Sequence, residues 1–386
     1  MSQYWTFTHG LRNACITVVI GLVLVAAPED SQAVEQSSAP AATRALERQL
    51  DVHDQAALTD TDPVDRQLAQ YARRVPEMGI VRLYGDQAAD FIRRLPGLLG
   101  EGAVNMDYEH DASMRNSLLE LQMNRIGVMI RAGLPSATLF KTGEGSVFEH
   151  PYLCVISLDP GPFRQDPYYA TWFLTSDYDR VYPVSTEKVL IKNADFLKFT
   201  VDHEMFHCLD AYFNGPPIKK THDAIYSHYQ TYVNEARADA FASQRFKREV
   251  AEPDRFLTTF AALRTLSLLA LDLGHFTGDV IRHSMNVPPL SAPRNLEQQV
   301  AACRELVSGV APSASRYGTR MASAVRLIGQ LGGDPNGLLL EFEGQKLPPH
   351  DESQVTALLH EVRQAQRILE GNSVPRANVR DISLLP

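Results

Sequence analysis

The sequence predicts an α+β protein, with helices first, then a small sheet, then a mostly helical C-terminal half. Residues 113–135 carry apolar side chains at helical spacing, and residues 146–193 hold short β-branched and aromatic runs bounded by Gly, Pro and Asp. Several long helical patterns follow from residue 194 onward. With 44% hydrophobic and 22% charged residues, the composition is that of a globular protein with enough apolar material for a core.

The N-terminus has the pattern of a secretory signal peptide over residues 1–33. Arg12 precedes an apolar run from Ala14 to Ala27, which is shorter than the roughly 20 residues that span a bilayer. Ser31 and Ala33 supply the small residues of a cleavage site. We therefore expect a periplasmic or secreted protein with no stable membrane insertion after cleavage; the alternative is an uncleaved membrane anchor.

The next segments set the expected domain organisation. Residues 34–62 are poor in large apolar side chains and are interpreted as a linker or short pro-segment. Helical patterns begin near Pro63, at residues 66–74 and 86–102. We expect a catalytic domain over residues 63–290 and a helical C-terminal region over residues 291–386.

Three runs predict the strands of a small mixed sheet, namely residues 146–161, 168–177 and 187–193. The stretch from Tyr152 to Leu158 could be an edge strand that pairs with an extended substrate, or an interior strand.

Two long helices follow the predicted sheet. Asn193 is a suitable N-cap for a helix that Gly215 and the two following prolines end. The second long helix covers roughly residues 223–250. Further helical patterns occupy residues 256–274, 295–310, 315–333 and 351–371.

The first long helix contains the sequence His203-Glu204-Met-Phe-His207. Residues four apart on an α-helix differ by about 40° in direction, so both imidazoles point to one side and can share a metal ion. Glu204 lies at the edge of that face, where it can reach a water on the metal without binding the metal. This is the H-E-x-x-H pattern, in which the glutamate acts as general base.

A catalytic zinc site normally has three protein ligands and one position for water. Residues 234–239 read Asn-Glu-Ala-Arg-Ala-Asp and lie on the second long helix. Together with the first motif, they resemble the gluzincin metallopeptidases, the thermolysin-like clan. The resemblance implies that Glu235 is the third ligand beside His203 and His207. It also implies that Asp239 hydrogen-bonds a ligand histidine, and that a small sheet packs on the active-site helix in a zincin-like fold.

The resulting expectation is an exported, zinc-dependent metallopeptidase that acts on peptide or protein substrates, with Glu204 as general base. The alternative is a zinc-binding but catalytically silent scaffold or interaction protein. The formal charge of −9 and the lack of a long basic run argue against a nucleic-acid partner.

Several neighbouring residues leave alternatives open. Tyr232 or His228 could donate a hydrogen bond to a reaction intermediate, or could simply pack in the helix interface. His283 follows Asp279 by four residues and could be a carboxylate-supported donor. Cys208 is expected as a buried core thiol. If the signal peptide is removed, three cysteines remain, which allows at most one disulfide.

Overall fold

The computed structural model describes residues 62–84, 87–107, 115–175, 188–189, 191–219, 221, 223–270, 272–290, 295–333, 347–372 and 374–375. The predicted signal peptide and nearly all of the predicted linker lie outside these ranges. The chain divides into two compact units, Met1–Met106 with His110–Asp159, and Asp107–Glu109 with Pro160–Pro386.

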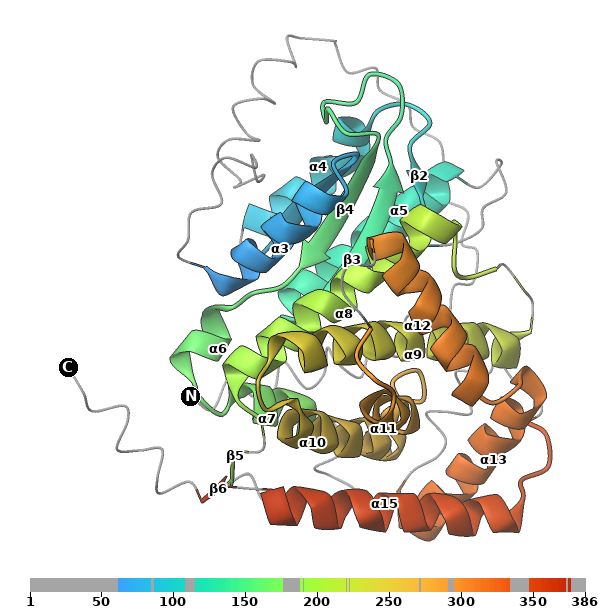
Figure 1. The fold of residues 1–386 in the computed structure, drawn as a ribbon. Helices are drawn as coiled ribbons and strands as arrows, with labels where there is room; N and C mark the ends of the chain where they lie inside the picture. The colour runs from blue at the N-terminus through green and yellow to red at the C-terminus, as the bar shows by residue number, and fades with distance from the viewer. Residues whose placement is uncertain are drawn as a thin grey trace, which may run out of the picture. The chain divides into compact units, whose positions relative to one another are not determined.

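The first unit contains a four-stranded mixed sheet with strand order β1-β4-β3-β2 (Figure 1). Strands β1 (Met78–Leu83) and β4 (Tyr152–Ser157) are parallel, whereas β3 (Ser136–Lys141) is antiparallel to both β4 and β2 (Val104–Asn105). Because β4 pairs on both sides, the interior-strand alternative is the one observed for Tyr152–Ser157.

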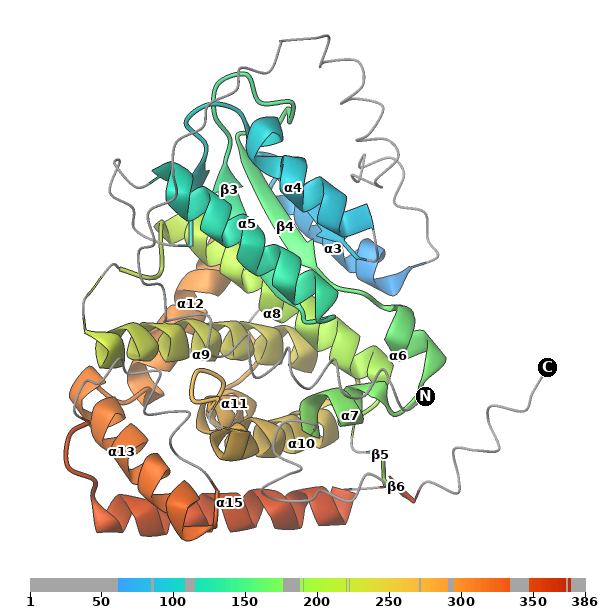
Figure 2. The ribbon, with the colours of Figure 1, turned by 180° about the vertical axis from the view of Figure 1, so that it is seen from behind.

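Helices α3 (Pro63–Arg74), α4 (Gln87–Leu99) and α5 (Arg115–Arg131) complete this unit, and α5 runs across one face of the sheet (Figure 2). Helices α4 and α5 pack against each other. Their apolar side chains, such as Phe91 and Ile126, form one buried cluster with strand residues such as Val81 and Val155. Burial of this face holds the short strands together.

The second unit is almost entirely helical within its described residues. It comprises α6 (Gly161–Gln165), α7 (Tyr169–Thr175), α8 (Asn193–Asn214), α9 (Ala224–Glu249), α10 (Pro253–Leu266), a 3₁₀ turn (Ser267–Ala270), α11 (Gly278–Asn286), α12 (Leu296–Val310), α13 (Ala314–Gln330) and α15 (Glu352–Asn372). Strands β5 (Lys188–Val189) and β6 (Val374–Pro375) form a short antiparallel pair. Together with the four-stranded sheet, this confirms the predicted α+β class with a mostly helical C-terminal half.

Helices α8 and α9 are the central pair of this unit and pack along each other. Helix α8 ends at Gly215, whose φ of 75° is accessible to glycine without a Cβ penalty. The prediction that Asn193 is the N-cap is wrong, because Lys192 occupies that position. The Asn193 side chain instead accepts from Ala170 N (3.0 Å) and donates to Phe163 O, tying α6 and α7 to α8.

One of the three predicted strands is wrong, and another, within residues 187–193, contains β5, which pairs with β6 and not with the four-stranded sheet. Residues 168–177 contain α7 rather than a strand. Their aromatic side chains pack as a cluster in which Tyr169 meets Phe163 edge-on at 4.7 Å and Phe173 approaches Phe196 at 5.7 Å. Aromatic residues favour strands only where a pleated surface receives them, and here a helical surface does.

The predicted C-terminal region contributes directly to the packing of the second unit. Arg304 of α12 donates to Asp210 of α8 at 2.7 Å, and α15 packs against α10. The boundary predicted at residue 290 stays a prediction. None of the described helices is both long enough and apolar enough to cross a membrane.

Candidate metal centre

The two histidines of the first motif lie on one face of α8 with their Nε2 atoms close together. The distance between His203 Nε2 and His207 Nε2 is 3.3 Å, and both side chains are largely buried. The spacing of four residues along the helix produces this arrangement, as the sequence predicts.

Glu235 comes to the same point from α9. Its Oε2 lies 3.0 Å from His203 Nε2 and 3.7 Å from His207 Nε2. The packing of α8 on α9 thus brings a carboxylate oxygen and two imidazole nitrogens together, although the residues are far apart in sequence. Glu235, predicted from the Asn-Glu-Ala-Arg-Ala-Asp motif, is at the centre of the group.

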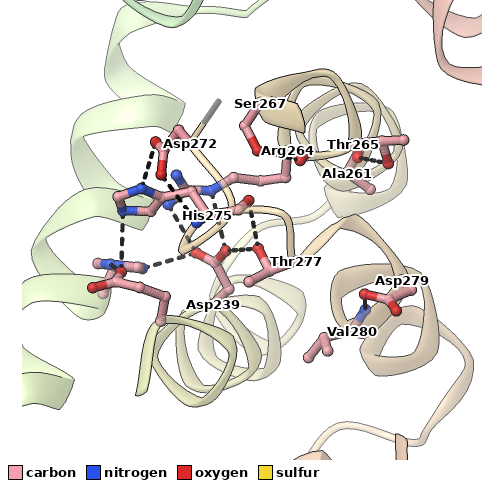
Figure 3. Close-up of polar contacts among 12 residues, drawn as sticks. Asp239, Ala261, Arg264, Thr265, Ser267, Asp272, His275, Thr277, Asp279 and Val280 are labelled. Carbon is pink, nitrogen blue, oxygen red and sulfur yellow. Dashed lines mark hydrogen bonds and ion pairs between the residues drawn. The ribbon is translucent and has the colours of Figure 1, made fainter. Parts of the chain in front are cut away.

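Asp239 lies one turn further along α9, fully buried behind His203. Its Oδ1 is 2.8 Å from His203 Nδ1 and accepts from Arg264 Nη2 at 3.2 Å, while its Oδ2 accepts from the Thr277 hydroxyl (Figure 3). Burial alone would raise the pKa of Asp239, but Arg264 and His203 lower it to about 2. An ionised Asp239 fixes the His203 proton on Nδ1 and leaves Nε2 free to bind a cation.

Asn234 contacts Nδ1 of His207, as Asp239 contacts Nδ1 of His203. Its Nδ2 lies 3.1 Å from His207 Nδ1, and its Oδ1 is buried without a hydrogen-bond partner among the described residues. Nitrogen and oxygen of an amide are assigned from the hydrogen-bond network. With the amide rotated by 180°, Oδ1 accepts from His207 Nδ1–H, so the buried oxygen is satisfied and His207 Nε2 is left as an acceptor.

His275 is a further member of the group, and no motif selects it in the sequence. It lies between the 3₁₀ turn and α11, with Nε2 3.2 Å from Glu235 Oε2 and Nδ1 2.7 Å from Asp272 Oδ2 (Figure 3). Ligand atoms of His203, Glu235 and His275 all lie within 4.8 Å of one another, so these residues could hold a metal ion. The local signal is an aspartate three residues before a histidine.

The electrostatics of the group favour a positive charge among the three imidazoles. Burial would lower the pKa of His203, but Asp239 and Glu235 raise it to about 9. Burial would likewise lower the pKa of His275, which Asp272 and Glu235 raise to about 10. Burial would raise the pKa of Glu235, yet His275 and His207 hold it well below its usual value. Protons and a metal ion therefore compete for the same nitrogens.

Glu204 is buried beside this group on α8. Burial raises the pKa of Glu204, and the charges of His203 and His207 oppose that rise. The pKa values of the two glutamates are thus shifted in opposite directions. The lowered pKa of Glu235 favours its ionised form, and the raised pKa of Glu204 favours its protonated form. Two carboxylates whose pKa values differ in this way are suited to different tasks, one binding a cation and the other exchanging a proton.

Two other candidates from the sequence, His283 and Tyr232, do not join the group. His283 is exposed, and Asp279 accepts from Arg320 at 3.2 Å instead of supporting it. Tyr232 is fully buried and packs on Tyr317 with ring centroids 5.0 Å apart, as in the packed-aromatic alternative.

The cysteines differ from expectation in one respect. Cys208 is buried, but it is disulfide-bonded, as is Cys154, so the prediction of a core thiol at position 208 is wrong. Cys303 is a free, buried thiol. Disulfides persist in oxidising compartments, and this one is consistent with a location outside the cytoplasm.

In comparisons with known proteins, no family model, no curated protein and no solved structure matches this chain. The resemblance to gluzincins therefore rests on the two short motifs and on the group of side chains that they bring together.

Proposed function

We propose that this protein is an exported zinc metallopeptidase in which His203, His207 and Glu235 hold the metal and Glu204 exchanges the proton. The observation that carries the proposal is the convergence of His203 Nε2, His207 Nε2 and Glu235 Oε2 within 3.7 Å of one another. Two imidazoles and one carboxylate are a donor set that catalytic zinc uses.

The hydrogen bonds behind the imidazoles support a cation at this point. Asp239 holds the His203 proton on Nδ1, and Asn234 can do the same for His207. Both Nε2 atoms are then acceptors that face each other and a carboxylate oxygen. Such an arrangement is unfavourable unless a positive charge lies between them, and zinc is the metal that imidazole-rich sites with one carboxylate commonly take.

When bound, a zinc ion would polarise the scissile carbonyl and make a water molecule more acidic. The chain's own part in the reaction falls to Glu204. Its buried carboxylate accepts a proton from the attacking water and returns it to the leaving amine, so that the amine departs as a neutral group. A raised pKa suits this role, because the same group must take up a proton and release it near neutral pH.

The test combines metal content with proteolysis of a chemically unfolded protein by the purified chain. Glu204→Gln should keep about one zinc per chain and lose activity about 10²- to 10⁴-fold, the usual contribution of a general base. Glu252→Gln, an identical change at an exposed glutamate, is the matched control and should keep both zinc and activity.

The outcomes separate this proposal from the scaffold alternative. Zinc bound by the wild-type chain without any peptide-bond cleavage on the unfolded substrate would favour a silent metal-binding protein. Wild-type zinc affinity in Glu235→Ala, measured by competition with a chelator, would show that the assignment of Glu235 as a ligand is wrong.

A further inference from the structure

We propose that His275 is an additional protein ligand of the metal, which gives the site three imidazoles and one carboxylate. This inference rests on the metal centre of the proposed function and extends its ligand set. The juxtaposition that carries it is His275 Nε2 at 3.2 Å from Glu235 Oε2, the same oxygen that lies 3.0 Å from His203 Nε2.

The direction of the His275 ring is fixed by its own loop. Asp272 Oδ2 lies 2.7 Å from Nδ1, and Asp272 Oδ1 accepts from the His275 backbone N–H at 3.3 Å. A carboxylate that accepts from Nδ1–H places the lone pair of the neutral ring on Nε2. That lone pair then faces Glu235, where two acceptors meet unless a cation or a proton lies between them.

The loop itself is held to the metal centre. Thr277 donates to Asp239, the carboxylate that also orients His203 (Figure 3). Tyr317 donates to Leu273 O at 3.4 Å. A Cβ added at Gly278 would come within 2.4 Å of Ala261 O, so only glycine lets α11 start this close to α10. These contacts set His275 in place independently of its contact with Glu235.

A metal ion accounts for the whole group better than protons do. If His203 and His207 both carried a proton on Nε2, the two N–H groups would oppose each other across 3.3 Å, whereas a metal ion between them accepts both lone pairs. A zinc ion bound by these side chains would remove the conflict among the facing acceptor atoms, and catalytic zinc can expand to five ligands, which leaves a position for solvent.

The direct test counts imidazoles by X-ray absorption at the zinc edge, using full-length protein without a histidine tag. Wild-type protein should show three imidazoles per zinc, and His275→Gln should show two. This measurement on the wild type needs no variant to fold. Two imidazoles in the wild-type spectrum would overturn the proposal.

Zinc affinity, measured by competition with a chromophoric chelator, is the second readout. Loss of a group that only orients a ligand lowers affinity about 10- to 100-fold. His275→Gln should therefore lose more than about 100-fold, whereas Asp272→Asn should lose about 10- to 100-fold and keep three imidazoles. His283→Gln, an exposed histidine on the following helix, should bind zinc like the wild type. Wild-type affinity in His275→Gln would also overturn the proposal.

The result is independent of the fate of the proposed reaction. Three imidazoles together with an active Glu204→Gln variant would refute the reaction and keep His275 as a ligand. Two imidazoles together with an inactive Glu204→Gln variant would do the reverse.

Discussion

At His207 the direction of the ring depends on Asn234, the residue before the predicted third ligand. The buried Asn234 Oδ1 lacks a partner among the described residues unless it accepts from His207 Nδ1–H. Replacing Asn234 by Ala should therefore lower zinc affinity about 10- to 100-fold, as measured by chelator competition.

Asn234→Asp is the matched variant for this prediction. It keeps an acceptor oxygen toward His207 Nδ1 and should retain affinity close to that of the wild type. Equal losses in the two variants would mean that the amide nitrogen, not the oxygen, faces the ring.

Helix periodicity predicted that His203 and His207 point the same way, whereas the roles of Glu235 and Asp239 came from the resemblance of their motif to the gluzincins. His203 and His207 share a face of α8, and Glu235 and Asp239 share a face of α9. His275 could not be selected in the same way, since it lies in an irregular segment where spacing does not determine direction. Its position follows from tertiary contacts of Asp272 and Thr277.

Among the helices, the junction between α10 and α11 depends on the small size of Gly278. An added Cβ would lie 2.2 Å from Thr265 Oγ1. Gly278→Ala should lower the free energy of unfolding by about 1–3 kcal/mol, the usual cost of overpacking, as measured by urea denaturation.

Gly309→Ala in α12 provides the contrast for that measurement. No atom lies within 4 Å of a Cβ built at Gly309, so alanine should raise the stability by up to about 1 kcal/mol through its higher helix propensity. A destabilised Gly309→Ala with a neutral Gly278→Ala would contradict this account.

The C-terminal end of α9 is tied to α8 by Glu249, which lies 2.6 Å from Lys198 Nζ and 2.9 Å from Arg245 Nη2. Burial would raise the pKa of Glu249, but Lys198 and Arg245 lower it below its ordinary value of 4.5. The unfolded chain therefore binds a proton more readily than the folded chain. The stabilisation is present above about pH 4.5 and is lost as the pH falls through the folded pKa.

Glu249→Gln should accordingly be less stable than the wild type at pH 7, with a difference that shrinks as the pH falls below about 4.5. Urea denaturation of both proteins at several pH values measures this difference. A gap that widened in acid would contradict the assigned direction of the pKa shift.

The long helices were predictable because their apolar spacing and caps agree with their final packing. Asp223 and Asn295 cap α9 and α12 through their side chains, as such residues commonly do. Strands β1 and β3 escaped prediction although each has six residues, as β4 does, because polar residues such as Arg82 and Thr138 interrupt their apolar runs. Helix α7 was predicted as a strand because its aromatic composition favours strands, whereas its cluster with α6 and α8 decides its structure.

For the whole molecule, metal binding and folding should be coupled. The metal-centre residues come from α8, α9 and the loop before α11, so the group forms only when these segments have packed. Above the dissociation constant, each tenfold rise in free zinc should add about 1.4 kcal/mol to the free energy of unfolding.

Thermal unfolding in zinc buffers of defined free concentration checks this expectation. Removal of zinc with a chelator should lower the unfolding temperature, and His203→Gln should shift the dependence to higher free zinc concentrations. Magnesium at equal concentration should have little effect, because it prefers oxygen ligands. An unfolding temperature that did not respond to the chelator would contradict a tight site in the folded protein.

The packing of the second unit also determines how reactive the Cys303 thiol is. This thiol is buried within α12, and burial together with the nearby Asp210 charge raises its pKa to about 12. Only a thiolate attacks a sulfur–sulfur bond, and almost none exists at this position near neutral pH. The same packing that joins α12 to α8 therefore keeps the Cys303 thiol from attacking the disulfide bond and exchanging its partners.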